Sequence, residues 1–272
     1  KRIWLYLERI ILKSEVWVDD KYIGSMSSLV GAHEYDLTDA VAAGSEHLLT
    51  IMIDNRDTFY LGTYGHSYTN ETQTIWNGIV GKICLIAREA VYLDEIMVFT
   101  DENNKKVQVK GVLKNYTKEK LSGRVIFSIK EHVNSNTSNT EGYCGSEIIA
   151  EDALSLAIES GESDFEYTLN IEKDVIQWSE FTPALYELDI ELTACENNPI
   201  CSKTNVVFGF RNVKVEGRDI IINNKKVFLR GNLECCIHPL TGYPPCDIEY
   251  WTNIFNTVKA YGMNHIRFHS NC

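Results

Sequence analysis

The sequence predicts a mainly β protein: two β-sandwich domains followed by the beginning of a (β/α)8 barrel. Apolar and polar residues alternate over much of residues 1–211, as they do in half-buried strands. Turn residues separate these runs, and hardly any helical period interrupts them, which is typical of sandwiches. After residue 212 a helical period stands between two apolar runs. That strand–helix–strand order is the unit of a parallel sheet or barrel.

The first predicted domain covers residues 1–92. Its opening strands place alternate apolar residues on one face, namely Ile3, Leu5, Leu7, Val16 and Val18. Asp19-Asp20-Lys21 predicts a turn, and 47–54 is a further β-rich run. The polar stretch 55–74 follows, and the apolar strand 82–87 is expected to end the domain.

The second predicted domain, residues 93–211, is all β. The expected strands are Ile96–Thr100, Lys106–Lys114, Gly123–Lys130, Asp164–Ile171, Tyr186–Cys195 and Asn205–Phe210. The segment 131–145 is rich in Asn, Ser and Thr and predicts a loop. Turn-separated strands of this kind favour a sandwich.

The third predicted segment, residues 212–272, changes pattern. Asn223-Asn224 predicts a hairpin turn. A helix is expected over 248–261, since Ile248, Trp251, Ile254, Phe255 and Val258 recur at helical spacing, and Gly262 suits its C-cap. The run 263–268 is expected to be a buried strand. Because a full barrel needs roughly 250 residues, we expect it to be truncated here.

The charge of the chain limits its partners. The net charge is -12 and the pI about 5.1, which disfavours nucleic acid. No apolar run approaches the roughly 20 residues of a membrane span, and no signal peptide or nucleotide-binding motif is present. The opening Lys1-Arg2-Ile3-Trp4 lacks an initiator Met, so we expect the chain to be part of a longer protein. No cofactor is predicted.

The eight cysteines do not form the framework of a small disulfide-rich protein. Cys195 and Cys201 flank a loop that could carry a cross-hairpin disulfide, or they are free. The others are expected to be free, buried thiols. A zinc site at Cys235-Cys236, His238 and Cys246 is disfavoured, because adjacent cysteines do not have zinc-ligand spacing.

Segments in a fixed order resemble family 2 glycoside hydrolases. Leu7-Glu8-Arg9, Val16-Trp17-Val18-Asp19 and Trp76-Asn77-Gly78-Ile79-Val80-Gly81 resemble the N-terminal jelly-roll sugar-binding domain. Trp178, Pro183, Leu185 and Tyr186 resemble the immunoglobulin-like domain that follows. Phe208-Gly209-Phe210-Arg211 and Phe228-Leu229-Arg230-Gly231 resemble the passage into the catalytic barrel, and Gly262-Met263-Asn264-His265-Ile266-Arg267 resembles the second barrel strand.

The resemblance implies a retaining exo-β-glycosidase, and β-galactosidase is the activity expected first for this family. Retention needs two carboxyls about 5 Å apart, which in this family are glutamates on later barrel strands. We therefore expect both beyond Cys272 and expect these 272 residues to be inactive. Asn70-Glu71 is the only Asn-Glu pair and is not assigned to catalysis. A bacterial polysaccharide-degrading role implies a periplasmic or extracellular location. The alternatives are a carbohydrate-binding module and a structural scaffold.

Five residues are candidates for substrate binding in the parent enzyme. The resemblance assigns Arg267 to the sugar pocket, with a structural ion pair as the alternative. A histidine near this position commonly touches substrate in the family, and the alternative is that His269 packs at a strand end. Glu234 and His238 are expected in the loop after the first predicted barrel strand, and ordinary loop residues without a contact to substrate are the alternative. Trp76 either extends towards the barrel mouth or anchors the core.

Further aromatic and apolar residues carry expectations of their own. Tyr60, Tyr64, His66 and Tyr68 resemble a sugar-stacking surface or an ordinary aromatic loop, and Thr72-Gln73-Thr74 is expected to order this loop. Exposed Ile254, Phe255 and Ile266 predict reduced stability or self-association as a homo-oligomer. The partner that the resemblance implies is a carbohydrate, a terminal β-glycoside.

Overall fold

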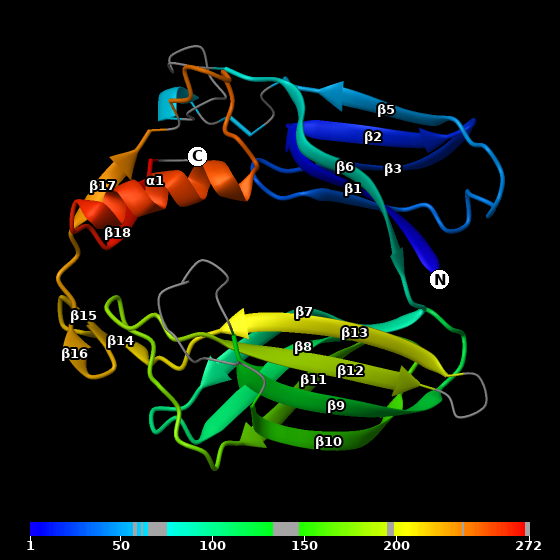
Figure 1. Ribbon diagram of the computed structural model, residues 1–272. Coiled ribbons are helices and arrows are strands. Elements are labelled where there is room, and N and C mark those ends of the chain that lie inside the picture. The colour runs from blue at the N-terminus through cyan, green and yellow to red at the C-terminus, as the bar shows by residue number, and fades with distance from the viewer. Residues whose placement is uncertain are drawn as a thin grey trace. The chain divides into compact units, whose positions relative to one another are not determined.

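The computed structural model describes residues 1–56, 59–60, 62–64, 75–132, 147–194, 199–235 and 237–269. Its contacts divide the chain into two compact units, 1–88 with 229–272, and 89–228 (Figure 1). The chain is mainly β, as predicted, and its described part contains one α-helix. The three segments predicted from the sequence, 1–92, 93–211 and 212–272, remain a prediction.

The first unit opens with a β-sandwich. Its elements are β1 (Arg2–Ile11), β2 (Lys13–Val18), β3 (Lys21–Ser27), β4 (His33–Asp36), β5 (Leu49–Asp54), the short 3-10 helix η1 (Gly62–Tyr64) and β6 (Gly78–Arg88). The strands form two antiparallel sheets in the orders β4-β1-β6 and β3-β2-β5. The turn predicted at 19–21 is confirmed, with Asp19 at a positive φ of 51° between β2 and β3.

The core of this sandwich comes from the alternation that the sequence displays. Side chains of successive strand residues point to opposite faces, so every second residue of β1 and β2 enters the core. The buried residues are Leu5, Leu7, Ile10, Val16, Val18, Tyr35 and Leu37. At the edge strand β6, however, Ile83 and Leu85 pair with the buried Leu7 and Leu5 yet remain 54% and 63% exposed.

A polar network lies inside the same sandwich. The Oγ of Ser14 lies 2.6 Å from Nδ1 of His33 and 2.7 Å from the hydroxyl of Tyr35, which in turn donates to the Ser14 carbonyl. All three residues are buried. Burial lowers the pKa of His33 and raises the pKa of Tyr35. Among the described residues, Nε2 of His33 has no hydrogen-bond partner.

The second unit is a seven-stranded sandwich. Its strands are β7 (Val91–Thr100), β8 (Lys106–Asn115), β9 (Leu121–Glu131), β10 (Ile148–Ile158), β11 (Gly161–Asn170), β12 (Tyr186–Ala194) and β13 (Ile200–Phe208). One sheet has the order β10-β9-β12-β13 and the other β11-β8-β7. This four-plus-three arrangement is that of an immunoglobulin-like sandwich, as predicted. Phe127 of β9 stacks on Tyr167 of β11 across the core, with ring centroids 4.7 Å apart.

Strand β10 was not among the strands expected from the sequence. Residues 148–158 read Ile-Ile-Ala-Glu-Asp-Ala-Leu-Ser-Leu-Ala-Ile, in which alanine and acidic residues weaken the β signal. The strand forms because it pairs antiparallel with β9 along almost its whole length, and Ile149 and Ile158 enter the core. Tertiary pairing thus overrides local propensity at this edge.

A small antiparallel sheet ends the second unit. It consists of β14 (Val213–Glu216), β15 (Asp219–Ile222) and β16 (Lys225–Lys226). The predicted turn is confirmed, since Asn223 and Asn224 both adopt positive φ, 50° and 61°. Asn223 also fixes the hairpin to the sandwich: its Oδ1 accepts from the backbone N–H of Asn212, and its Nδ2 donates to the carbonyl of Trp178.

The cysteine predictions are partly wrong. Cys201 is a free, exposed thiol that donates to Glu191, and Cys195 lies outside the described residues. Cys84 and Cys235 are free and half-buried, whereas Cys246 is free and exposed rather than buried. Cys246 follows Pro244-Pro245 in the segment before α1, outside any strand or helix.

Candidate functional site

A parallel strand–helix–strand unit completes the first unit of the chain. It consists of β17 (Gly231–Glu234), α1 (Ile248–Ala260) and β18 (His265–Phe268), with β17 and β18 paired in parallel beside the helix (Figure 1). Asp247 caps the helix by accepting from the Tyr250 N–H, and Gly262 follows the C-cap at a φ of 75°. The strand–helix–strand order predicted from the sequence is confirmed; the barrel itself remains a prediction.

The expectation of a buried second strand is wrong. In β18, His265 and Ile266 are half-buried, and Arg267 and Phe268 are exposed. The reason is that the described part of this sheet has two strands, with α1 on one face through the Trp251–Phe268 ring contact at 5.9 Å. The helix itself buries no residue fully, and Ile248, expected on its apolar face, is 86% exposed.

Three of the predicted site residues lie at the carboxyl ends of the paired strands β17 and β18, where their backbones are close together. Glu234, which was expected in the loop, is instead the last residue of β17, because it pairs with Phe268 of β18. Arg267 lies in β18, and the N–H of His269 donates to the Glu234 carbonyl at 2.8 Å. Glu234 pairs with Phe268, the residue that contacts α1, whereas Arg267 is one position earlier. Because successive strand residues point to opposite faces, Arg267 projects from the face away from the helix, and Glu234 does not share that face.

His238 lies in the loop after β17 and is buried. Its Nδ1 is 3.1 Å from the hydroxyl of Tyr250, and its ring contacts those of Tyr250 and Trp251, with centroids 6.0 and 6.1 Å away. Burial lowers the pKa of His238, and the negative charge of Glu234 opposes that change. The imidazole is therefore neutral at pH 7, inside an aromatic cluster.

Trp76 lies apart from the other four candidates. It is 5% exposed and packs with Ile11 and Leu12, and the Arg9 guanidinium carbon lies 5.8 Å from its ring centroid. In the described part of the chain, no hydrogen bond or ring contact joins Trp76 to Glu234, His238, Arg267 or His269. Its packing agrees with a core anchor, which was the alternative that the sequence left open.

Other sequence expectations fall outside the described residues. These are the side chain of Tyr64, His66, Tyr68, Asn70-Glu71, Thr72-Gln73-Thr74, residues 133–146, Cys236 and Ser270. Tyr60 is described and is 88% exposed. In the described ranges, no cluster of three or more His, Cys, Asp or Glu side chains is placed to hold a metal ion. Nor does any described helix have the length and apolar character needed to cross a bilayer.

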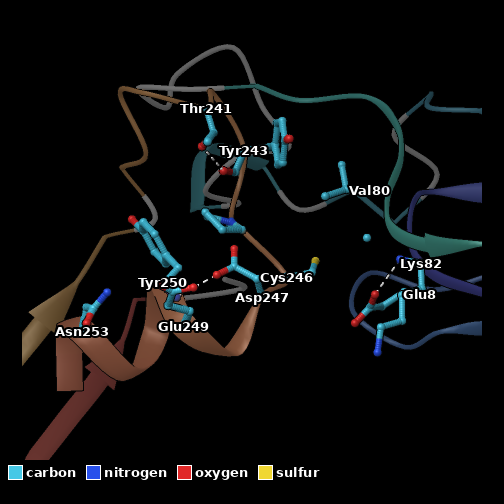
Figure 2. Close-up of a pocket in the computed structure, with 12 residues that line it drawn as sticks. Glu8, Val80, Lys82, Thr241, Tyr243, Cys246, Asp247, Glu249, Tyr250 and Asn253 are labelled. Carbon is cyan, nitrogen blue, oxygen red and sulfur yellow. Dashed lines mark hydrogen bonds between the residues drawn. The ribbon is translucent and has the colours of Figure 1, made fainter. Parts of the chain in front are cut away.

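A cleft of about 550 Å³ lies between the first sandwich and the segment that leads into α1 (Figure 2). One wall comes from β1 and β6, where the N–H of Lys82 donates to Oε2 of Glu8 at 2.6 Å. The other wall comes from residues 241–253, including Tyr250, whose hydroxyl contacts His238. Figure 2 shows Glu8 and Lys82 on the sandwich side and Asp247, Glu249, Tyr250 and Asn253 on the helix side.

Sequence reasoning did not identify this cleft. Glu8 and Asp247 are far apart in the sequence, and no local pattern connects them. The available signals were weak: Glu8 and Gly81 belong to segments that carried the family resemblance, and Pro244-Pro245 precedes the helix. These segments come together only because residues 241–253 pack near β1 and β6 in the folded chain.

Comparison with known proteins defines the class. Residues 91–211 match the family model "Glycosyl hydrolases family 2". These residues span the seven-stranded sandwich described above, which is therefore similar to the domain that this family model represents. The resemblance inferred from the sequence is thereby confirmed.

Solved structures match nearly the whole chain. A family 2 member from Bacteroides cellulosilyticus matches with a TM-score of 0.76 and 18% identity, over 99% of this chain and 35% of that one. A Bacteroides uniformis β-glucuronidase matches with a TM-score of 0.74 and 17% identity, over 98% of this chain and 31% of that one. A putative β-galactosidase from Bacteroides fragilis matches with a TM-score of 0.70 and 17% identity, over 98% of this chain and 39% of that one. The likeness shows the shared fold, and the chain spans about a third of the length of these proteins.

Proposed function

We propose that the chain is the front part of a retaining exo-β-glycosidase that hydrolyses terminal β-linked sugars. The observation that carries this proposal is the order of the elements. A sandwich that matches the family 2 model at 91–211 is followed by a parallel β17–α1–β18 unit, which carries Arg267 and His269 at the carboxyl end of its second strand. In (β/α)8 barrels, functional side chains gather at that end. We therefore interpret the unit as the beginning of a catalytic barrel.

The two residues have distinct roles in this proposal. Arg267 projects away from α1, the direction of a barrel interior, where its guanidinium can donate to sugar hydroxyls and to a neighbouring carboxylate. His269 is held in place by its backbone bond to Glu234 and can exchange a hydrogen bond with a hydroxyl. Neither residue supplies the pair of carboxyls that retention requires. We propose that those glutamates lie on strands outside the 272 residues, so that this chain alone does not hydrolyse glycosides.

A β-galactoside is the proposed substrate. Among the matched structures, one is a putative β-galactosidase, and several are β-glucuronidases from Bacteroides uniformis and Parabacteroides merdae. The net charge of -12 favours a neutral galactoside over an anionic glucuronide. The place of action that we propose is the periplasm or the extracellular space, where such glycosides are degraded. Immunodetection of the protein in cell fractions would test this location.

The activity is tested by comparing this chain with the longest product of its gene. Both are purified and incubated with an aryl β-galactoside and an aryl β-glucuronide. We expect turnover of the galactoside by the long product and none by the 272-residue chain. Arg267→Ala in the long product is expected to reduce kcat/KM by at least about 100-fold, the loss of about 2.7 kcal/mol of transition-state binding. Turnover by the short chain, or an inactive long product, would contradict the proposal.

A second candidate is a carbohydrate-binding protein without catalysis. The cleft between β1, β6 and the segment before α1 favours it, because binding there requires no barrel. An inactive long product that still binds sugar would support this candidate. A purely structural scaffold is the remaining alternative, and it predicts neither turnover nor binding.

A further inference from the structure

The cleft beside β1 and β6 is separate from the strand-end residues discussed above. Its volume of about 550 Å³ lies within the range of small-molecule sites. Its lining comes from the sandwich and from the segment 241–253, and it includes neither Arg267 nor His269. A ligand bound here would therefore use different side chains from a ligand bound at the carboxyl ends of β17 and β18.

The helix supplies a row of polar groups to the cleft. Glu249 and Asn253 are four residues apart, and Tyr250 lies between them, so all three lie on neighbouring positions of one helix surface. The described residues offer no hydrogen-bond partner to the Glu249 carboxylate or to the Asn253 side-chain amide. The Tyr250 hydroxyl is positioned by Nδ1 of His238. The helix thus presents acceptors, an amide donor and an oriented hydroxyl.

The opposite wall is held by a hydrogen bond between β1 and β6. Oε2 of Glu8 accepts from the Lys82 N–H, and Gly81 adopts a φ of 79°. A Cβ at position 81 would lie 2.4 Å from Oε2 of Glu8 and 3.1 Å from Sγ of Cys246. Because Gly81 has no side chain, the Glu8 carboxylate can lie over β6, and Cys246 in the segment before α1 can approach the same strand.

The charge and the aromatic groups define the ligand class. Three carboxylates, those of Glu8, Asp247 and Glu249, line the cleft beside one lysine, Lys82. This excess of negative charge disfavours uronates and phosphates. Tyr243 and Tyr250 add aromatic faces, which suit the C–H face of a sugar ring. We propose that the cleft is a subsite for a neutral, hydroxyl-rich ring such as a hexose, separate from the site at Arg267.

The subsite can be tested with the 272-residue chain itself. The probe is methyl β-D-galactopyranoside, its binding is followed by calorimetry, and galacturonate is the charged comparison. The neutral sugar is expected to bind with a Kd in the millimolar range, and galacturonate about tenfold more weakly. Asn253→Ala removes an amide that lines the cleft and is expected to weaken binding about fivefold.

Two controls locate the ligand. Glu46→Gln changes an exposed carboxylate outside the cleft, and Arg267→Ala changes the strand-end site; both are expected to leave the affinity unchanged. Circular dichroism establishes that each variant is folded. Weakening by Arg267→Ala, with or without an effect of Asn253→Ala, would overturn a separate subsite while supporting the proposed function. Absence of binding by the short chain would also overturn the subsite, but the hydrolysis assay on the long product would stand independently.

Discussion

The hydroxyl of Tyr250, in the first turn of α1, lies 3.1 Å from Nδ1 of the buried His238 in the loop after β17. This contact joins the loop to the helix and orients a hydroxyl at the rim of the cleft. It also satisfies one nitrogen of a ring whose other nitrogen has no partner among the described residues.

Tyr250→Phe should destabilise the chain. The substitution keeps the ring and its contacts but leaves the buried imidazole of His238 without its hydroxyl partner, a loss of about 1–3 kcal/mol. The free energy of unfolding in urea measures the effect. Tyr243→Phe is the matched control, since the described residues give its hydroxyl no hydrogen bond. Equal stabilities for the two variants would show that the His238 contact does not contribute.

The stability of the chain should fall in mild acid. Burial lowers the pKa of both His33 and His238, so the unfolded chain binds protons below about pH 6.5 that the folded chain does not. The free energy of unfolding therefore decreases as the pH falls below that value, and it levels off once the folded histidines are protonated too. Each histidine contributes a slope of at most about 1.4 kcal/mol per pH unit.

Variants separate the two histidines. His33→Gln and His238→Gln should each reduce the slope of unfolding free energy against pH between about pH 7 and about pH 5, and the double variant should reduce it further. The slope is the quantity to compare, because either substitution changes the absolute stability as well. A double variant with an undiminished slope would assign the acid sensitivity to other groups.

Asn223→Ala should be more harmful than Asn224→Ala. Both positions have positive φ, so alanine is strained at both. Only Asn223 also bonds to the backbone of Asn212 and Trp178, and its loss leaves a donor and an acceptor unpaired. We expect Asn223→Ala to cost about 1–3 kcal/mol more than Asn224→Ala in urea unfolding. Similar costs would indicate that backbone strain alone governs this turn.

Gly81→Ala should destabilise the chain more than Gly78→Ala. Both glycines have positive φ, 79° and 88°, but a Cβ at position 78 meets no atom within 4 Å. A Cβ at position 81 displaces the Glu8 carboxylate from the Lys82 N–H. The extra cost should be about 1–2 kcal/mol, which urea midpoints can resolve. If Gly78→Ala proves as costly, the Glu8 bond is not the reason that position 81 is glycine.

Patterns that depend on neighbouring residues were predictable from the sequence. The alternation that includes Val16 and Val18 placed both in the core, and paired asparagines placed the turn at 223–224, because these features reflect local side-chain geometry. Strand β10 was missed, since its partner β9 supplies the stabilisation rather than its own composition.

The candidate site was only partly predictable, for the same reason. The strand-end position of Arg267 follows from the order of strand, helix and strand, which the sequence displays. The burial of His238 does not, because it depends on where the loop places that ring against Tyr250 and Trp251. The cleft does not follow from the order of the elements either, because it lies where residues 241–253 meet β1 and β6.

The edge strand β6 has a practical consequence for handling the purified chain. Ile83 and Leu85 are exposed beside backbone groups at the edge of the described sheet, a combination that recruits strands from other molecules. Solubility should therefore be limited by this short stretch despite the abundant negative charge elsewhere. Leu85→Lys would place a positive charge in this exposed apolar stretch. It should raise the concentration up to which the chain remains monodisperse.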